Sequence, residues 1–164
     1  MLPRDYVKQR DIEIVLSEMA EQVAIRMRRE HQKATIVSIF VTYSKTEMKQ
    51  PINAQMKIEP TNHTRLLTDT VLTLFRKKYT SGAVWGIAVN YSGFVDENYA
   101  FISLFDDIEA TEKEENLQRT IDHIRDQFGF LAVQKGTALL DSSRNIARSK
   151  LIGGHSAGGL EGLQ

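Results

Sequence analysis

The first part of the chain carries apolar side chains at steps of three and four positions. The stripe consists of Ile12, Val15, Leu16, Met19, Val23 and Met27. Because an α-helix returns to the same face about every 3.6 residues, this spacing predicts an amphipathic helix over 9–31. Arginines near the end of this segment suit the negative pole of a helix dipole.

Three later segments show the composition or the alternation of β-strands. Residues 34–43 are rich in β-branched and aromatic side chains. Residues 52–59 alternate between apolar and polar side chains. Residues 83–91 alternate between large and small ones, which places Trp85, Ile87, Val89 and Tyr91 on one face. A polar connection over 45–51 predicts that the first two strands form a hairpin with a long loop.

Two further helices are predicted, over 62–79 and 112–128. Pro60-Thr61-Asn62 is expected to end the preceding strand and to supply an N-cap for the first of them. Its inner face would consist of Leu67, Val71, Leu74 and Phe75. The inner face of the last helix would consist of Leu117, Ile121, Ile124 and Phe128, with Gly129 at its end.

The order of these elements, α-β-β-α-β, predicts an α+β fold in which a small antiparallel sheet carries two helices on one face. A C-terminal helical extension follows. We therefore expect one domain over 1–95, an acidic link over 96–110, and a helical extension with a glycine-rich tail over 111–164.

The strand positions that face away from these helices form the most informative pattern in the sequence. They are Ser38, Thr42, Asn53, Gln55, Lys57, Gly86, Ala88 and Asn90. Most are small and uncharged, whereas an ordinary solvated face usually carries more Lys, Glu and Arg. Two interpretations stand: a solvated face, or a flat surface that lets a polymer backbone approach closely enough for backbone N–H groups to bind phosphates.

The net charge of zero is an average over unequal segments. Residues 1–95 carry +5, residues 96–126 carry −7 and residues 127–164 carry +2. Because salt screens charges over about 8–10 Å, a moderately basic domain beside an acidic segment remains compatible with a polyanionic partner. The chain has no cysteine and no apolar run of membrane-spanning length, so we expect a soluble, cytoplasmic protein without disulfides.

Catalytic and metal-binding patterns are scarce. The four histidines show no metal-ligand spacing, and Asp106-Asp107 stands without a third carboxylate in a recognisable frame. Ser156 lies in a glycine-rich stretch and lacks the strand and helix that a nucleophile elbow needs. We expect no catalytic residue, no metal site and no cofactor in this chain.

The run Phe101, Ile102, Ser103, Leu104 and Phe105 lies within the acidic link. Alternation would make it a fourth strand. Alternatively it is an exposed linear motif, in which Leu104 and Phe105 fill a hydrophobic pocket on a partner.

Several stretches, in order along nearly the whole chain, resemble the C-terminal part of a Y-family DNA polymerase of the UmuC/ImpB/MucB type, in the Gram-positive UV-repair branch. They are Leu2-Pro3-Arg4-Asp5-Tyr6, Glu18-Met19-Ala20-Glu21, the strand 35–44, Gln55-Met56-Lys57, Pro60-Thr61-Asn62, Leu72-Thr73-Leu74-Phe75, Ser103-Leu104-Phe105 and Leu151-Ile152-Gly153-Gly154-His155.

This resemblance implies the little-finger domain, a non-catalytic module that grips primer–template duplex without sequence specificity. The DNA-binding residues would be Arg4, Thr42, Ser44, Lys45, Gln55, Lys57 and Asn90. The Mg²⁺-dependent catalytic carboxylates would belong to a palm domain elsewhere in the parent polymerase. The chain is then expected to be a fragment that begins inside the first little-finger strand and is associated with the nucleoid in the cell.

The same resemblance makes residues 101–105 similar to the sliding-clamp motif Gln-Leu-Ser/Asp-Leu-Phe. Ser103, Leu104 and Phe105 match it, whereas Phe101 replaces the glutamine and cannot offer its amide hydrogen bonds. The partners implied are DNA, the sliding clamp and the rest of the polymerase chain, with no membrane. Two alternatives remain: a protein-interaction module whose main role is docking, and an unrelated α+β domain without a nucleic-acid role.

Overall fold

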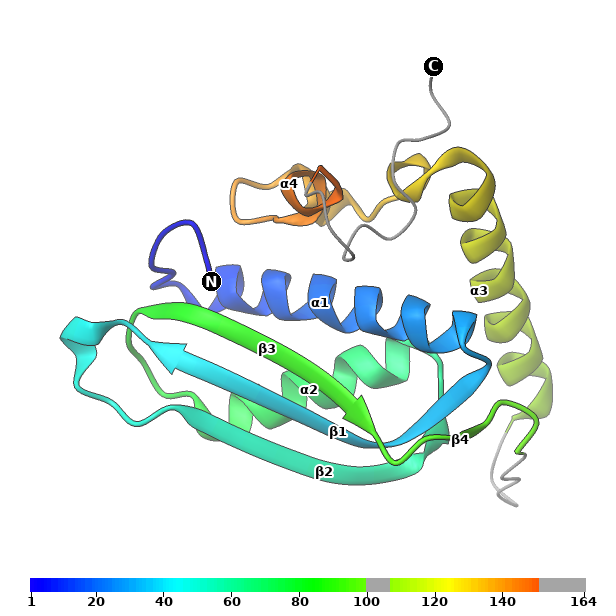
Figure 1. Cartoon of the computed structure of the whole chain (residues 1–164), viewed down its shortest axis with the longest axis horizontal. Helices are drawn as coiled ribbons and strands as arrows, with labels where there is room; N and C mark the ends of the chain where they lie inside the picture. The colour runs from blue at the N-terminus through cyan, green and yellow to red at the C-terminus, as the bar shows by residue number, and fades with distance from the viewer. Residues whose placement is uncertain (100–106, 151–164) are drawn as a thin grey trace. The chain divides into compact units, whose positions relative to one another are not determined.

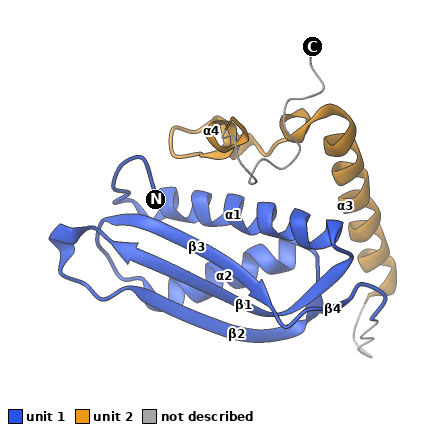
Figure 2. Cartoon of the chain, viewed as in Figure 1, with its two compact units in different colours: residues 1–99 blue, residues 100–164 orange. Residues whose placement is uncertain are grey.

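The computed structural model describes residues 1–99 and 107–150 (Figure 1). The chain divides into two compact units, residues 1–99 and residues 100–164 (Figure 2). Unit 1 contains a sheet and two long helices. Unit 2, as far as it is described, is helical.

The sheet of unit 1 is antiparallel and has β1 at its centre. Its strands are β1 (Gln32–Tyr43), β2 (Ile52–Thr61), β3 (Val84–Ser92) and the short β4 (Val95–Asp96). The order is β2-β1-β3, and β4 pairs with the beginning of β1. On the outer side of β3, Tyr6 and Val84 exchange backbone hydrogen bonds of 2.8 and 2.9 Å. The segment before the first helix therefore continues the sheet beyond β3.

Helices α1 (Gln9–Arg29) and α2 (Thr64–Lys78) cover one face of this sheet. α1 packs on β3 and β1, and α2 packs on β2 and β1. Figure 1 shows α2 running behind the strands. The most deeply buried side chains of unit 1 are Ile12, Val15, Leu16, Val37, Ile39, Val41, Leu67, Val71, Phe75 and Val84. The predicted α+β fold with two helices on one sheet face is confirmed.

Two local details of unit 1 differ from the sequence prediction. A bulge in β3 shifts the register between Thr42, which pairs with Gly86, and Tyr43, which pairs with Val84, so Val84 takes the inward position expected for Trp85. Val84 is consequently fully buried, while Trp85 is only half-buried. At the beginning of α2 the N-cap residue is His63 rather than Asn62, and its amide donates to the Thr61 hydroxyl at 3.1 Å.

Unit 2 begins with the long helix α3 (Ile108–Phe128). Asp107 caps it by accepting the Ala110 amide at 3.0 Å, and Gly129 ends it with φ of 93°. Short 3-10 turns (Phe130–Ala132 and Gly136–Leu139) and α4 (Asn145–Ser149) follow. Arg125 holds this turn region together, because Nη2 donates to the Val133 carbonyl at 2.7 Å and the guanidinium lies 4.8 Å from the Phe130 ring centroid.

The predicted inner face of the last helix is wrong in part. Leu117 is 57% exposed and Phe128 is 69% exposed, while Ile121 and Ile124 are half-buried. The spacing of the apolar residues correctly predicted a helix. Among the described residues of unit 2, however, no layer comparable to the sheet of unit 1 covers this apolar stripe.

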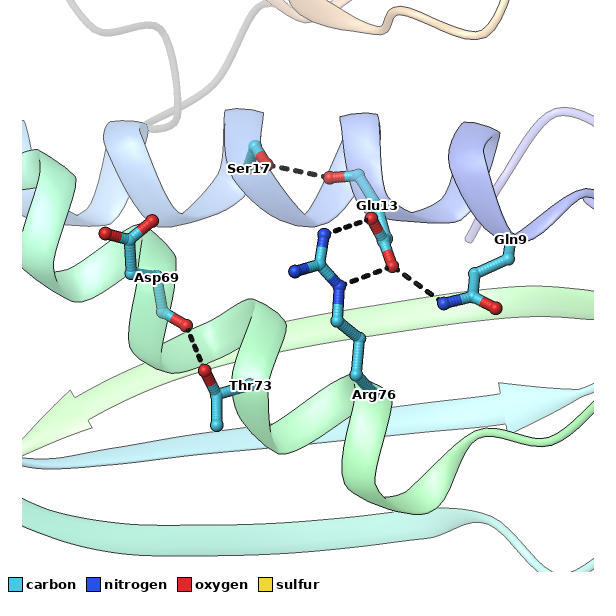
Figure 3. A network of polar contacts seen from close by, with 6 residues as sticks. All are labelled: Gln9, Glu13, Ser17, Asp69, Thr73 and Arg76. Carbon is cyan, nitrogen blue, oxygen red and sulfur yellow. Dashed lines mark hydrogen bonds and ion pairs between the residues drawn. The ribbon is translucent and has the colours of Figure 1, made fainter.

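α1 and α2 are joined by a two-point ion pair at their surface (Figure 3). The Arg76 Nε and Nη2 atoms donate to the two carboxylate oxygens of Glu13 at 2.9 and 2.7 Å. Gln9 also donates to this carboxylate, at 2.8 Å. The hydrogen bond from Arg76 lowers the pKa of Glu13 below its usual value of 4.5, although partial burial opposes that shift.

Replacing Tyr91 with Phe should lower the free energy of unfolding by about 1 kcal/mol. The Tyr91 hydroxyl is buried and donates to the Ala20 carbonyl at 2.9 Å, so this change removes a hydrogen bond between β3 and α1 without removing the ring. Urea unfolding followed by circular dichroism measures the difference. Tyr99→Phe, at a 52% exposed position, is the matched control and should leave the unfolding midpoint unchanged. Equal effects of the two changes would contradict this role of Tyr91.

Glu13→Gln should lower the melting temperature at pH 7 and have a smaller effect at pH 3. Because the pKa of Glu13 is lowered in the folded state, its contribution is fully present above the usual pKa of 4.5 and is lost as the pH falls through the folded value. Thermal melts of both proteins between these pH values test this. Glu109→Gln, which breaks an exposed pair within α3, is the control and should show a smaller difference at pH 7. A pH-independent effect of Glu13→Gln would count against the ion pair.

Candidate nucleic-acid interface

The sheet face opposite α1 and α2 is here called the open face. It consists of Ile36, Ser38, Phe40 and Thr42 on β1, Asn53, Gln55 and Lys57 on β2, and Gly86, Ala88, Asn90 and Ser92 on β3. Directly paired residues of antiparallel strands point to the same face, so the register places all of these side chains together. Lys57 carries the one formal charge among them.

The register arranges the open face in rows that run across the three strands. Gln55 pairs with Ser38, and Ser38 pairs with Asn90. The Ser38 hydroxyl donates to the Asn90 carbonyl at 3.3 Å. Gln55 and Asn90 are exposed on either side of the half-buried serine. This row therefore presents amide donors and acceptors above both outer strands.

At one end of the open face, Gly86 leaves the strand backbone without a covering side chain of its own. A Cβ atom at this position would lie 2.2 Å from the Thr42 hydroxyl, so any larger residue would force the threonine to move. The absence of a side chain lets Thr42 extend across towards β3. A surface built this way allows a ligand backbone to come close to the strands.

Three predicted residues lie around the end of the sheet where β1 stops. Ser44 follows β1 directly, and its amide donates to the Ala83 carbonyl at 2.8 Å. Lys45 is exposed in the next turn (Lys45–Glu47). Arg4 is exposed on the segment beside β3, with its guanidinium 5.9 Å from the Tyr6 ring centroid.

The structure thus brings four of the predicted DNA-binding residues onto one surface: Thr42, Gln55, Lys57 and Asn90. Arg4, Ser44 and Lys45 lie at one end of the sheet rather than on the open face. The five residues of the predicted clamp motif, 101–105, lie outside the described residues.

Two residues near this surface were given no role from the sequence. Lys49, in the loop after β1, lies 5.5 Å from the Tyr43 ring centroid and donates to the Ser81 carbonyl at 2.6 Å. Phe40 is 44% exposed in the middle of the open face. Alternation alone placed Phe40 on this side of β1, but its exposure depends on the small neighbours that the register supplies.

A metal centre or a membrane segment finds no support in the described part of the chain. Among residues 1–99 and 107–150, no group of three or more His, Asp or Glu side chains is placed to hold a metal ion. Within the same ranges, no helix combines the length and apolar character needed to cross a bilayer. Asp107, one of the adjacent carboxylates considered above, serves as the cap of α3.

An antiparallel sheet with helices on one face and an exposed, mostly uncharged opposite face defines a domain of the α+β class. Residues 1–104 match the model of the impB/mucB/samB family C-terminal domain. The chain belongs to this family, the C-terminal domain of Y-family DNA polymerases, as its sequence resemblance implied.

Curated relatives agree with this membership. The chain is 32% identical over 157 residues to DNA polymerase IV 2 of Halalkalibacterium halodurans, covering 94% of this chain and 37% of the relative. It is 30% identical over 158 residues to UvrX of Bacillus subtilis, a UV-damage repair protein by name, covering 96% of this chain and 38% of that protein. DNA polymerase IV 2 of Bacillus subtilis is 30% identical over 156 residues. The chain therefore spans little more than a third of the length of these relatives.

Proposed function

We propose that this chain is a non-catalytic DNA-binding part of a translesion DNA polymerase, and that it grips primer–template duplex through the open face. One observation carries the proposal. In a family whose named members are DNA polymerases and repair proteins, one sheet face is left without a covering layer in the described residues of unit 1, and amide and hydroxyl side chains make up about half of it. Such groups, together with backbone N–H groups, are common phosphate ligands.

The small number of cationic side chains on and near the open face suits weak, readily reversible binding of duplex DNA. Lys57 lies on the open face, while Arg4 and Lys45 lie at the end of the sheet next to Thr42. Few phosphates would be neutralised, so the dissociation constant at physiological salt should be about 10⁻⁴–10⁻⁶ M. A domain that travels along a template with its polymerase needs contacts of this kind, which position the duplex without reading its sequence.

In this proposal, catalysis of nucleotide transfer is carried out by other parts of a longer polymerase. The Mg²⁺-dependent transfer of nucleotides would use carboxylates of a palm domain outside this chain. The residues of unit 1 would hold the duplex beside that centre. The partners of this chain would then be DNA and the rest of its own polymerase, in the cytoplasm at the nucleoid.

Replacing Lys45 and Lys57 together with Ala should weaken duplex binding and reduce the salt dependence of the dissociation constant. Each lost phosphate contact lowers the slope of log K against log salt by about 0.9, so the double change should lower it by about 2. Fluorescence anisotropy with a labelled primer–template duplex between 50 and 200 mM salt, about the range over which such contacts are lost, measures both quantities.

The matched control for this experiment removes two lysines of unit 2, by Lys113→Ala and Lys135→Ala. That variant has the same change in net charge and should keep the slope of the original protein. Equal losses in both double variants would mean that net charge alone drives binding. Absence of any salt-sensitive binding by the unmodified chain would refute the proposal itself.

We further propose that residues 101–105 dock the polymerase on the sliding clamp. The support is the agreement of Ser103, Leu104 and Phe105 with the clamp motif in an acidic segment that follows the sheet of unit 1. A docking motif placed beside a weak DNA-binding domain would raise the effective concentration of the polymerase at the primer end. Phe101 in place of glutamine should make this contact weaker than that of a complete motif.

Replacing Leu104 and Phe105 with Ala should abolish capture of the chain by immobilised clamp and leave duplex binding unchanged. The two side chains would be the anchors of the motif, and neither belongs to the open face. Surface plasmon resonance with purified clamp provides the readout, and Phe101→Gln should strengthen it. If duplex binding and stability fall together with clamp capture, the segment is part of the fold rather than a docking motif.

A further inference from the structure

The helix α3 carries an apolar stripe that the described part of unit 2 leaves largely uncovered. The stripe consists of Leu117, Ile121, Ile124 and Phe128. Leu117 is 57% exposed and Phe128 is 69% exposed, while Ile121 and Ile124 are half-buried. A single exposed apolar side chain is ordinary on a protein surface, but a row of neighbouring ones on one helix face marks a contact surface. The α3 stripe is therefore a candidate docking site.

The spacing of the α3 stripe favours another helix as its occupant. Alternating steps of four and three residues are those of the a and d positions of a heptad seam, which repeats about every 3.5 residues. On one flank of the stripe, Arg125 reaches the turn region, where its Nη2 donates to the Val133 carbonyl at 2.7 Å. The other flank is lined by exposed side chains that include Thr120 and Gln127. A second helix can approach the stripe from that flank.

The charges of unit 2 indicate in which direction that helix runs. Residues 107–115 hold five carboxylates and one lysine, a balance of −4, whereas residues 116–128 hold two arginines and two aspartates, a balance of zero. Residues 129–150 hold four basic side chains and one aspartate, a balance of +3. A parallel copy of α3 would place two acidic halves side by side. An antiparallel copy places each acidic half beside a neutral one, towards the basic turn region, and also opposes the two helix dipoles.

We propose that the occupant is a second copy of this chain, and that two α3 helices pack antiparallel along their stripes. In this arrangement Leu117 of one copy lies opposite Phe128 of the other, and Ile121 lies opposite Ile124. Two identical helices that run antiparallel are related by a two-fold axis, so the contact closes at a dimer. The inference goes beyond the proposed function and does not depend on the binding of DNA.

The size of the α3 stripe sets the strength of this dimer. Its apolar side chains extend over about three helical turns, and such a contact buries less than the roughly 1,200 Å² below which complexes are usually weak and transient. We therefore expect a dissociation constant on the order of 10⁻⁵ M. Monomer and dimer should then exchange, and the dimer should form only where the local concentration of the chain is high.

Sedimentation velocity of the whole chain from about 10⁻⁶ to 10⁻³ M tests the association. The average mass should rise with concentration from that of one chain towards that of two. Leu117→Gln combined with Phe128→Gln should raise the dissociation constant by at least about tenfold, because it replaces the two most exposed apolar side chains of the stripe. Glutamine favours helices, and far-UV circular dichroism checks that the helix content is retained.

Ile108→Gln combined with Leu139→Gln is the matched control. Ile108 is 61% exposed and Leu139 is 85% exposed, so this variant also removes two exposed apolar side chains from unit 2. Because an α-helix turns about 100° per residue, Ile108 lies on the side of α3 opposite Leu117. The control variant should associate as the unmodified chain does.

Disulfide cross-linking tests the direction of the helices, because the chain contains no cysteine of its own. In the antiparallel arrangement Thr120 of one copy lies near Gln127 of the other, so a mixture of Thr120→Cys and Gln127→Cys chains should form the mixed disulfide on oxidation. Each variant alone should form little disulfide, since the same position in two antiparallel copies is about 10 Å apart and a disulfide spans at most about 7 Å between Cα atoms. This experiment leaves the stripe intact, so it decides the matter even if the glutamine variant loses its helix.

Three results would overturn this inference. A chain that stays monomeric across the whole concentration range would leave the stripe to a segment of different sequence. Equal weakening of association by the control variant would remove the stripe from the contact. Efficient disulfide formation by each cysteine variant alone would show that the helices run parallel. None of these results bears on duplex binding, so the proposed function is tested separately.

Discussion

The rest of unit 1 depends on the burial of one face of its antiparallel sheet by two helices. Val37, Ile39 and Val41 alternate along β1 and are at most 1% exposed, so the central strand lies directly beneath α1 and α2. Burial of each such side chain contributes about 1.5–3 kcal/mol, and this drives the α1 and α2 stripes onto the same side of the sheet. Because both helices lie on that side, the other face of the sheet is left uncovered within unit 1.

The stability of the domain and its candidate binding surface are therefore carried by alternate residues of the same strands. Side chains such as Ala54 of β2 and Val89 of β3 belong to the core, and their neighbours Gln55 and Asn90 do not. A change of polar residue on the open face leaves the core packing intact.

The helices and strands of unit 1 could be predicted from the sequence because their periodicity is strong. The alternation over 52–59 and the stripe of α1 match the observed strand and helix. The inward position of Val84 in place of Trp85 could not be predicted, because a bulge inserts one residue into a strand without a local sequence signal. The α3 stripe was misjudged in part because spacing shows that a helix is amphipathic and says nothing of what covers it.

The residues of the candidate site could likewise be predicted from the sequence only in part. Period-two spacing was enough to group Thr42, Gln55, Lys57 and Asn90 on one face once three strands were assumed. Strand order and register were needed to separate them from Ser44 and Lys45 and to show that Phe40 stands exposed among smaller neighbours. Those quantities depend on pairings between distant segments, which a single sequence does not contain.

The position of β2 at the margin of the sheet has a consequence for association between copies of the chain. Tyr6 and its neighbours occupy the outer side of β3, whereas in the described residues no strand pairs with the outer side of β2. A bare strand edge is a template for aggregation. In β2 that edge carries Lys57, Glu59 and Pro60 close together. An incoming strand would desolvate these two charged side chains, and proline has no N–H to offer it. The sequence of β2 thus protects a flat, exposed sheet from adding a second copy of itself.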